Sequence, residues 1–152
     1  MKIFEQFKNA EKFAHDNSEA FCYNCYKVVP KDINGKTFCS ECGSDDLMRF
    51  IAGVGTEYGY EWISEHLIEE NLNAINEDDE YEENMRSLYT DTVSICGYDY
   101  DPVDTLKYLD PIAWRCGRFD WLDFMINDDE LVEINDKYYR FYDVEEFFEK
   151  IA

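Results

Sequence analysis

Two matched cysteine pairs, CYNC at residues 22–25 and CSEC at residues 39–42, form the stretch of this sequence that decides a local fold. Two residues separate the cysteines within each pair, and thirteen residues separate the two pairs. A Cys-x-x-Cys turn can hold both sulfurs about 2.3 Å from one metal ion, and two such turns complete a tetrahedron. The spacing therefore predicts one zinc ion bound by Cys22, Cys25, Cys39 and Cys42.

A zinc ion with four protein ligands has no open position for water, so the predicted ion is structural rather than catalytic. The same cysteines also allow four free core thiols or a thioredoxin-like redox pair. The redox interpretation is disfavoured because no helical pattern follows the first cysteine of either pair. Cys96 and Cys116 have no histidine or acidic partner at ligand spacing, so we expect both to be small buried apolar groups.

Residues 19–51, which carry both cysteine pairs and Gly43, resemble the zinc ribbons and rubredoxin-like knuckles of many transcription, translation and phage proteins. Two roles remain open for this ribbon. It is either a metal staple for a segment too small to fold on its own core, or a contact surface. Lys27, Lys31, Lys36 and Arg49 are its candidate nucleic-acid contacts, but four cations beside a very acidic remainder favour the staple.

Residues 51–152 carry an extreme negative charge. They contain 27 acidic and 7 basic residues, a net of −20, whereas residues 1–50 are close to neutral. Duplex DNA carries one charge per roughly 1.7 Å, so this net charge equals that of about 34 Å of duplex. Such a field repels nucleic acid and anionic membranes and attracts basic proteins. We therefore expect a basic, nucleic-acid-binding host protein or complex as partner, with no direct nucleic-acid contact and no membrane association.

The acidic residues are densest between residues 57 and 83. Glutamates recur at every fourth position of a helix predicted from Thr56 to Ile75, and an acidic run precedes a helix predicted near Asn84–Tyr89. Like charges at this spacing are neighbours on the helix surface. The residues expected to contact the partner are Glu57, Glu61, Glu65, Glu69, Glu70, Glu77, Asp78, Asp79, Glu80, Glu82 and Glu83.

The hydrophobic pattern predicts an α+β fold in three parts: an N-terminal helix in residues 1–18, the zinc ribbon in 19–51, and a mainly helical acidic body in 52–152. Residues 52–55 are the expected joint. Asp101-Pro102 and Asp110-Pro111 each predict a helix start, and the second helix is expected to bury Ile112, Phe119, Leu122 and Met125. Asn135-Asp136 predicts a β-hairpin before a final helix that begins at Asp143.

Composition limits the class of protein. Aromatic residues make up 17% of the chain, which is too many for a disordered acidic tail. The first fourteen residues are charged and amphipathic, unlike a signal peptide, and no apolar run is long enough to span a membrane. We therefore expect a cytoplasmic protein, in which paired cysteines bind metal rather than form disulfides.

In charge, size and aromatic content, the acidic body resembles the DNA-mimic proteins of phages and mobile elements, among them anti-restriction and anti-CRISPR inhibitors. The resemblance implies a stoichiometric, phage-encoded inhibitor that occupies the nucleic-acid-binding site of a host defence complex. An alternative is a zinc-ribbon adaptor that binds a basic surface of the host transcription or translation machinery.

Two other classes are disfavoured. Residues 103–141 have the element order of a winged helix, but Asp120 and Asp123 accompany Arg115 and Arg118 on the helix that would read DNA. Catalysis is disfavoured because the sequence has two histidines, no Ser/His/Asp set, no phosphate-binding loop and no open metal site. We therefore expect a protein that is not an enzyme.

Overall fold

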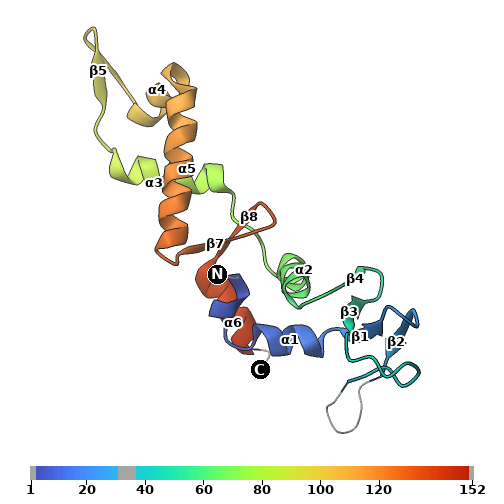
Figure 1. Cartoon of the computed structure of the whole chain (residues 1–152). Helices are drawn as coiled ribbons and strands as arrows, with labels where there is room; N and C mark the ends of the chain where they lie inside the picture. The colour runs from blue at the N-terminus through green and yellow to red at the C-terminus, as the bar shows by residue number, and fades with distance from the viewer. Residues whose placement is uncertain (1–2, 31–36, 151–152) are drawn as a thin grey trace. The chain divides into compact units, whose positions relative to one another are not determined.

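The computed structural model describes residues 3–30 and 37–150 (Figure 1). The chain forms two compact units, one of Met1–Leu72 with Asp143–Ala152 and the other of Asn73–Tyr142. Helices and strands occur in both units, which confirms the α+β class. This division differs from the expected one. The first unit continues past residue 51 to Leu72, and it also includes the C-terminal helix.

The ribbon is an antiparallel sheet of four short strands in the order β2-β1-β3-β4. The strands are β1 (Glu19–Cys22), β2 (Lys27–Val29), β3 (Met48–Ile51) and β4 (Gly55–Glu57). Residues 52–55 were expected to be a joint between domains. Instead, residues 52–54 turn the chain from β3 into β4, which begins at Gly55. Gly53 makes this turn with a φ of 77°, which glycine adopts without steric cost.

The helical part of the first unit consists of η1 (Ile3–Gln6), α1 (Ala10–Asp16), α2 (Glu61–Asn71) and most of α6 (Phe141–Lys150). The expected N-terminal helix is interrupted at Asn9, whose left-handed backbone (φ 71°) asparagine tolerates. Helix α2 begins at Glu61 rather than Thr56, because residues 55–57 pair with β3 and Gly59 has a φ of 78°. Helix α6 begins two residues before the expected Asp143.

Phenylalanine rings from both ends of the chain form the core of this helical part. The ring centroid of Phe148 on α6 lies 6.3 Å from that of Phe4 and 5.8 Å from those of Phe7 and Phe13. All four side chains are buried. This contact explains why the C-terminal helix belongs to the first unit.

The second unit contains three helices and two hairpins: α3 (Glu77–Leu88), β5 (Val93–Ile95), β6 (Tyr98–Tyr100), α4 (Pro102–Leu109), α5 (Pro111–Asn127), β7 (Leu131–Ile134) and β8 (Lys137–Arg140). Both Asp-Pro helix starts are confirmed, because the Asp101 carboxylate accepts a 2.9 Å hydrogen bond from the Asp104 N–H and the Asp110 carboxylate caps α5 in the same way. The predicted hairpin is also confirmed. Asn135 and Asp136 turn it with φ values of 50° and 60°.

Tyr81 of α3 is the centre of the packing between α3 and α5. Its buried ring lies 4.6 Å from the Trp114 ring and 5.8 Å from the Trp121 ring, measured between centroids. Of the residues expected to be buried on α5, Leu122 is buried and Met125 half-buried. Ile112 and Phe119 are 66% and 51% exposed. Those two predictions were wrong because periodicity identifies an apolar stripe but not whether another element covers it.

None of the helices in residues 3–30 and 37–150 combines the length and apolar character needed to cross a membrane.

Candidate metal centre and acidic helix

The four cysteine sulfurs of the ribbon converge on one point. All four Sγ atoms lie within 4.8 Å of one another, with 3.6 Å between Cys22 and Cys42 and 3.7 Å between Cys25 and Cys39. A tetrahedron of thiolates around zinc has S–S edges of about 3.8 Å, because each Zn–S bond is about 2.3 Å. The residues present therefore fit a structural Zn²⁺ site, as the spacing predicts.

The two cysteine turns share one backbone geometry. Tyr26 follows the first pair with a φ of 53°, and Gly43 follows the second with a φ of 71°. In the second turn the Gly43 N–H donates to the Cys39 carbonyl at 2.8 Å. In both turns the N–H of the second cysteine hydrogen-bonds to the sulfur of the first. These bonds help to orient the four sulfurs toward one point.

Without a cation, four thiols this close cannot all ionise. The Cys42 N–H is the main cause that lowers the pKa of Cys39 to about 7. Hydrogen bonds with Cys42 and Cys39 raise the pKa of Cys25 to about 12. For Cys22 the largest effect, the Cys25 N–H, lowers the pKa, but burial and hydrogen bonds with the Cys42 and Cys39 thiols raise it overall. A divalent cation removes this conflict by stabilising all four thiolates.

The two basic residues in the described part of the ribbon, Lys27 and Arg49, are engaged within the fold. Arg49 is buried, and its guanidinium donates to the Ser18 hydroxyl at 2.9 Å, the Ser18 carbonyl at 2.5 Å and the His15 carbonyl at 3.0 Å. Lys27 pairs with Glu41, which links β2 to the second cysteine turn. Lys31 and Lys36 lie outside the described residues. Neither Arg49 nor Lys27 is therefore a free cation for a phosphate.

Comparison with known proteins supports the ribbon alone. Residues 16–78 match a family model described as "Nin one binding (NOB1) Zn-ribbon like". This is less than half of the chain, and it includes the whole four-stranded sheet and α2. Among curated proteins and among solved structures, none matches the chain. The match and the sulfur cluster together establish an N-terminal zinc ribbon that binds structural Zn²⁺.

Cys96 and Cys116 are both exposed, contrary to the expectation that they are buried. Cys96 has a φ of 53° and forms, with Gly97, the turn between β5 and β6. Cys116 lies on the solvent side of α5. The sequence indicates that neither is a metal ligand, but it does not indicate burial, which depends on tertiary packing.

The residues expected to contact a partner do not form one helical stripe. Glu57 lies on β4, while Glu61, Glu65, Glu69 and Glu70 lie on α2 in the first unit. Glu61, Glu65 and Glu69 are only half-exposed, and Glu70 lies 3.4 Å from His66 between side-chain atoms. The remaining six lie on α3 in the second unit: Glu77, Asp78, Asp79, Glu80, Glu82 and Glu83.

Helix α3 begins inside the acidic run rather than after it. The Asn76 side chain caps its first turn by accepting hydrogen bonds from the N–H groups of Asp78 and Asp79 at 3.1 and 3.2 Å. All four residues of this turn, 77–80, are acidic, and negative charge at a helix N-terminus stabilises the helix dipole. The expected start at Asn84 was therefore wrong, and the signal that would have located the true start is Asn76.

Four cations of the second unit pair with α3. Arg86 donates to Glu82 at 2.7 Å, Lys107 to Glu82 at 2.6 Å and Arg140 to Glu80 at 2.6 Å, while Arg118 pairs with Asp78. Arg86 also contacts the carboxylates of Asp101 and Asp104 at 3.1 and 2.6 Å. Only the contact between Glu82 and Arg86, four residues apart on one helix, is readable from sequence.

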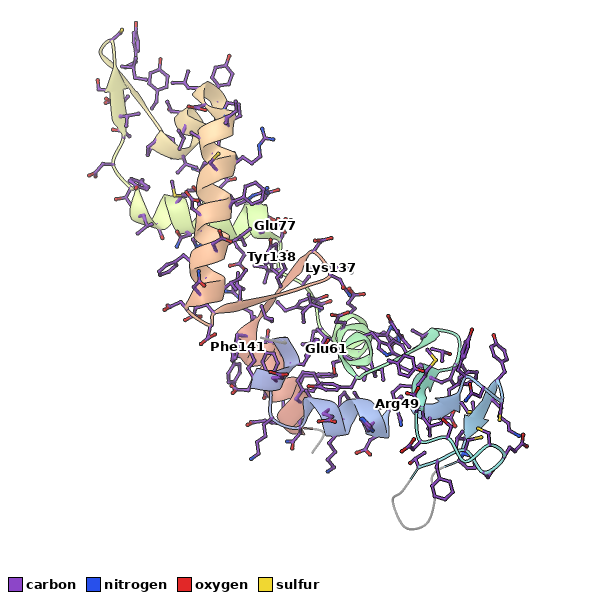
Figure 2. All side chains as sticks on the ribbon, in the orientation of Figure 1. Arg49, Glu61, Glu77, Lys137, Tyr138 and Phe141 are labelled. Carbon is purple, nitrogen blue, oxygen red and sulfur yellow. The ribbon has the colours of Figure 1, made fainter. Side chains whose placement is uncertain are left out.

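Acidic residues near α3 also affect Tyr138 of β8, which is labelled with Glu77 of α3 in Figure 2. Burial raises the pKa of Tyr138, and the negative charges of Glu133, Glu77 and Asp123 raise it further. The Ile75 N–H donates to the Tyr138 carbonyl at 2.8 Å, which holds the residues before α3 against β8. The charges of Glu133, Glu77 and Asp123 therefore add to the effect of burial on Tyr138, and Arg118 partly opposes them.

Glu82 is expected to stabilise the second unit in a pH-dependent way. Hydrogen bonds from Lys107 and then Arg86 lower the pKa of Glu82, so its contribution is complete above the ordinary glutamate pKa and is lost as pH falls below it. At pH 7, Glu82→Gln should lower the melting temperature of this unit by about 4–8 °C, if this partly screened network contributes about 1 kcal/mol. The difference from wild type should shrink as the pH falls below the ordinary glutamate pKa and disappear only below the lowered pKa of Glu82.

Glu83→Gln, an exposed neighbour on the same helix, is the matched control. Thermal melts followed by residue-resolved NMR separate the second unit from the ribbon, whose thiolates also respond to acid. Equal melting temperatures for Glu82→Gln and wild type at pH 7 would contradict the stabilising role.

Proposed function

We propose that this protein is a stoichiometric, non-enzymatic inhibitor in the cytosol, which uses the acidic surface of its second unit to occupy the basic site of a nucleic-acid-binding protein. The observation that carries the proposal is the charge of Asn73–Tyr142, which contains 18 acidic and six basic residues, a net of −12. Four of the six cations already pair with α3. Few positive charges are left to offset the rest of the surface.

The outer face of α3 is the part of this surface best suited to a cationic cleft. Asp79 and Glu83 are both exposed and lie four residues apart, so they are neighbours about 6 Å apart along the helix axis. Asp78, Glu80 and Glu82 face the internal cations instead. One side of α3 is therefore neutralised by cations of the same unit, whereas the side that carries Asp79 and Glu83 keeps its negative charge.

The target class we propose is a host defence complex, as for anti-CRISPR and anti-restriction inhibitors encoded by phages. Such a complex holds nucleic acid in a positively charged channel, so a folded anion of similar charge density competes for the same surface. The ribbon then serves as a staple, since Arg49 is buried and Lys27 is paired.

The test uses charge reversal on the outer face of α3. Asp79→Lys/Glu83→Lys should weaken target binding by about tenfold or more, because loss of complementary charge slows association and adds repulsion. Glu145→Lys/Glu149→Lys on α6 is the matched control, with two exposed glutamates four residues apart in the other unit. The target is first captured from nuclease-treated host lysate at low salt, and is then titrated with each variant and with duplex DNA.

Competition decides between inhibition and simple docking. The proposal requires that duplex DNA displaces the wild-type protein from the captured target and that the protein alone does not shift duplex DNA in a gel. A ternary complex of protein, target and DNA at saturating protein would overturn it. Equal loss of binding in the α6 control would show that net charge matters rather than the face of α3.

A second candidate function is a zinc-ribbon adaptor on the transcription or translation machinery. The match of residues 16–78 to a ribbon family described as Nin one binding favours it, since that description names a protein partner for that family. The ribbon also exposes Tyr23, Tyr26 and Phe38, at 66%, 78% and 48%. A ternary complex that is lost on Tyr23→Ala/Phe38→Ala would support the adaptor.

A further inference from the structure

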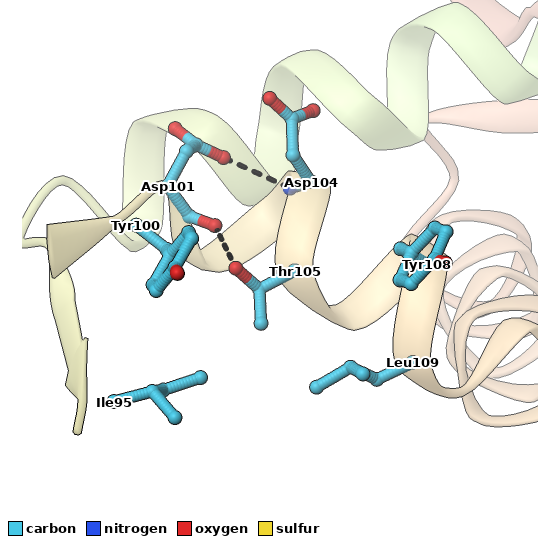
Figure 3. A pocket seen from close by; sticks show the side chains of 7 residues that line it. All are labelled: Ile95, Tyr100, Asp101, Asp104, Thr105, Tyr108 and Leu109. Atoms are coloured by element: carbon cyan, nitrogen blue, oxygen red, sulfur yellow. Dashed lines mark hydrogen bonds between the residues drawn. The ribbon is translucent and has the colours of Figure 1, made fainter. Parts of the chain in front are cut away.

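An apolar groove of about 480 Å³ lies between the β5–β6 hairpin and α4 (Figure 3). Ile95 of β5 and Leu109 of α4 lie on either side of the gap, with Tyr100, Thr105 and Tyr108 completing its lining. Asp101 and Asp104 belong to the same groove, but their carboxylates contact Arg86. The groove is therefore apolar inside and lies within an acidic unit.

The hairpin that forms one wall is not covered by the second unit. All six residues of β5 and β6 are exposed, among them Val93, Ile95, Tyr98 and Tyr100 at 37%, 43%, 69% and 47%. A two-stranded hairpin is marginally stable unless one face packs on something. Tyr108 and Leu109 across the groove are 87% and 67% exposed. Contiguous exposed apolar groups of this size mark an interaction surface.

Charge identifies the class of occupant. A second copy of this unit would also have a net charge of −12, and repulsion between the two copies opposes self-association. Asp91, two residues before β5, and Asp99, the middle residue of β6, are both exposed in this part of the unit. A ligand with an apolar side chain flanked by lysine or arginine is complementary to this site, because the groove is apolar and the unit around it is acidic.

We propose that this groove binds a segment of a basic protein that inserts one aromatic or branched aliphatic side chain between Ile95 and Leu109. The inference depends on the proposed function in one respect, namely that the partner is a basic protein. It adds an apolar anchor to the electrostatic attraction of α3. Buried apolar and aromatic anchors commonly contribute most of the affinity of an interface, whereas charge mainly contributes on-rate and specificity.

The test uses the full zinc-loaded chain and two short peptides, acetyl-Lys-Leu-Trp-Lys-amide and acetyl-Glu-Leu-Trp-Glu-amide. In ¹⁵N NMR titrations the lysine peptide should cause saturable shifts at the amides of Ile95, Tyr100, Thr105 and Leu109. The glutamate peptide should bind at least about tenfold more weakly, because it is negatively charged like the second unit. Leu109→Ser should abolish the shifts.

Leu88→Ser is the matched control, since Leu88 is 66% exposed in the same unit and does not line the groove. Equal binding of both peptides, shifts that survive Leu109→Ser, or shifts confined to the ribbon would each overturn the inference. Groove shifts that grow with protein concentration alone, with sedimentation of a dimer, would assign the groove to a second copy and also overturn it.

The two proposals fail separately. If the peptide binds in the groove but duplex DNA does not displace the protein from its captured target, the inhibitor proposal is refuted and the groove proposal stands. Target binding that is lost in Asp79→Lys/Glu83→Lys, with no peptide bound in the groove, would refute the groove and leave the inhibitor standing.

Discussion

Replacing Cys39 with serine is expected to unfold the four-stranded ribbon and leave Asn73–Tyr142 folded. The apolar core of the ribbon consists of Ala20, Cys22, Val29 and Cys39, so two of its four buried residues are zinc ligands. Binding of structural zinc to small domains is worth about 10–16 kcal/mol at pH 7, which such a core cannot replace. Loss of one thiolate should remove most of this free energy.

Zinc content and NMR measure the effect together. Wild-type protein purified without chelator should contain one zinc per chain, and Cys39→Ser should contain far less and lose the dispersed amide signals of β1–β4. Cys96→Ser is the control, because Cys96 is exposed and lies outside the sulfur cluster. The zinc centre would be refuted by wild-type protein that carries no stoichiometric metal, or by a Cys39→Ser ribbon that keeps its metal and its fold.

Gly117→Ala is expected to destabilise the second unit, although alanine is the better helix former. A Cβ at Gly117 would lie 2.4 Å from the Tyr81 hydroxyl oxygen. Tyr81 cannot easily move away, because its buried ring packs on Trp114 and Trp121. Overpacking of this kind costs about 1–3 kcal/mol or more, against a helix-propensity gain of about 1 kcal/mol. We expect a net loss of about 1–2 kcal/mol, because the rigid, buried ring places the cost in the upper part of this range.

Tyr81→Phe in the same chain makes the explanation testable. Without the hydroxyl, the nearest Tyr81 atom to the new Cβ is the ring carbon at 3.5 Å, an ordinary contact. The double variant should therefore be more stable than Tyr81→Phe alone, by up to about 1 kcal/mol. Urea denaturation of the four proteins in this cycle gives the coupling free energy. Additive effects of the two substitutions would refute the clash.

The features that the sequence predicted correctly are those encoded by neighbouring residues. The cysteine spacing identifies the zinc ligands, Asp-Pro identifies the starts of α4 and α5, and Asn135-Asp136 identifies the turn between β7 and β8. Each depends on backbone geometry within a few residues, where the side chain and the conformation it favours are both visible in the sequence.

The features that the sequence predicted wrongly depend on contacts between distant segments. Residues 52–55 looked like a joint because small residues are flexible, yet Gly55 already pairs with Ile51 of β3 and begins β4. Cys96 and Ile112 are apolar enough for a core, but no element of the second unit covers them. Sequence pattern reports the preference of a side chain, whereas burial depends on which other segments reach it.

By itself, the sequence determined the zinc centre, the α+β class and the negative field of residues 51–152, because ligand spacing, periodicity and charge are properties of the chain before it folds. Only the tertiary structure decided which acids face outward. Arg118 and Arg140 reach α3 from 40 and 60 residues away to hold Asp78 and Glu80. The tertiary structure likewise brought Ile95 and Leu109 to one groove, since both the ion pairs and the groove depend on the packing of distant segments.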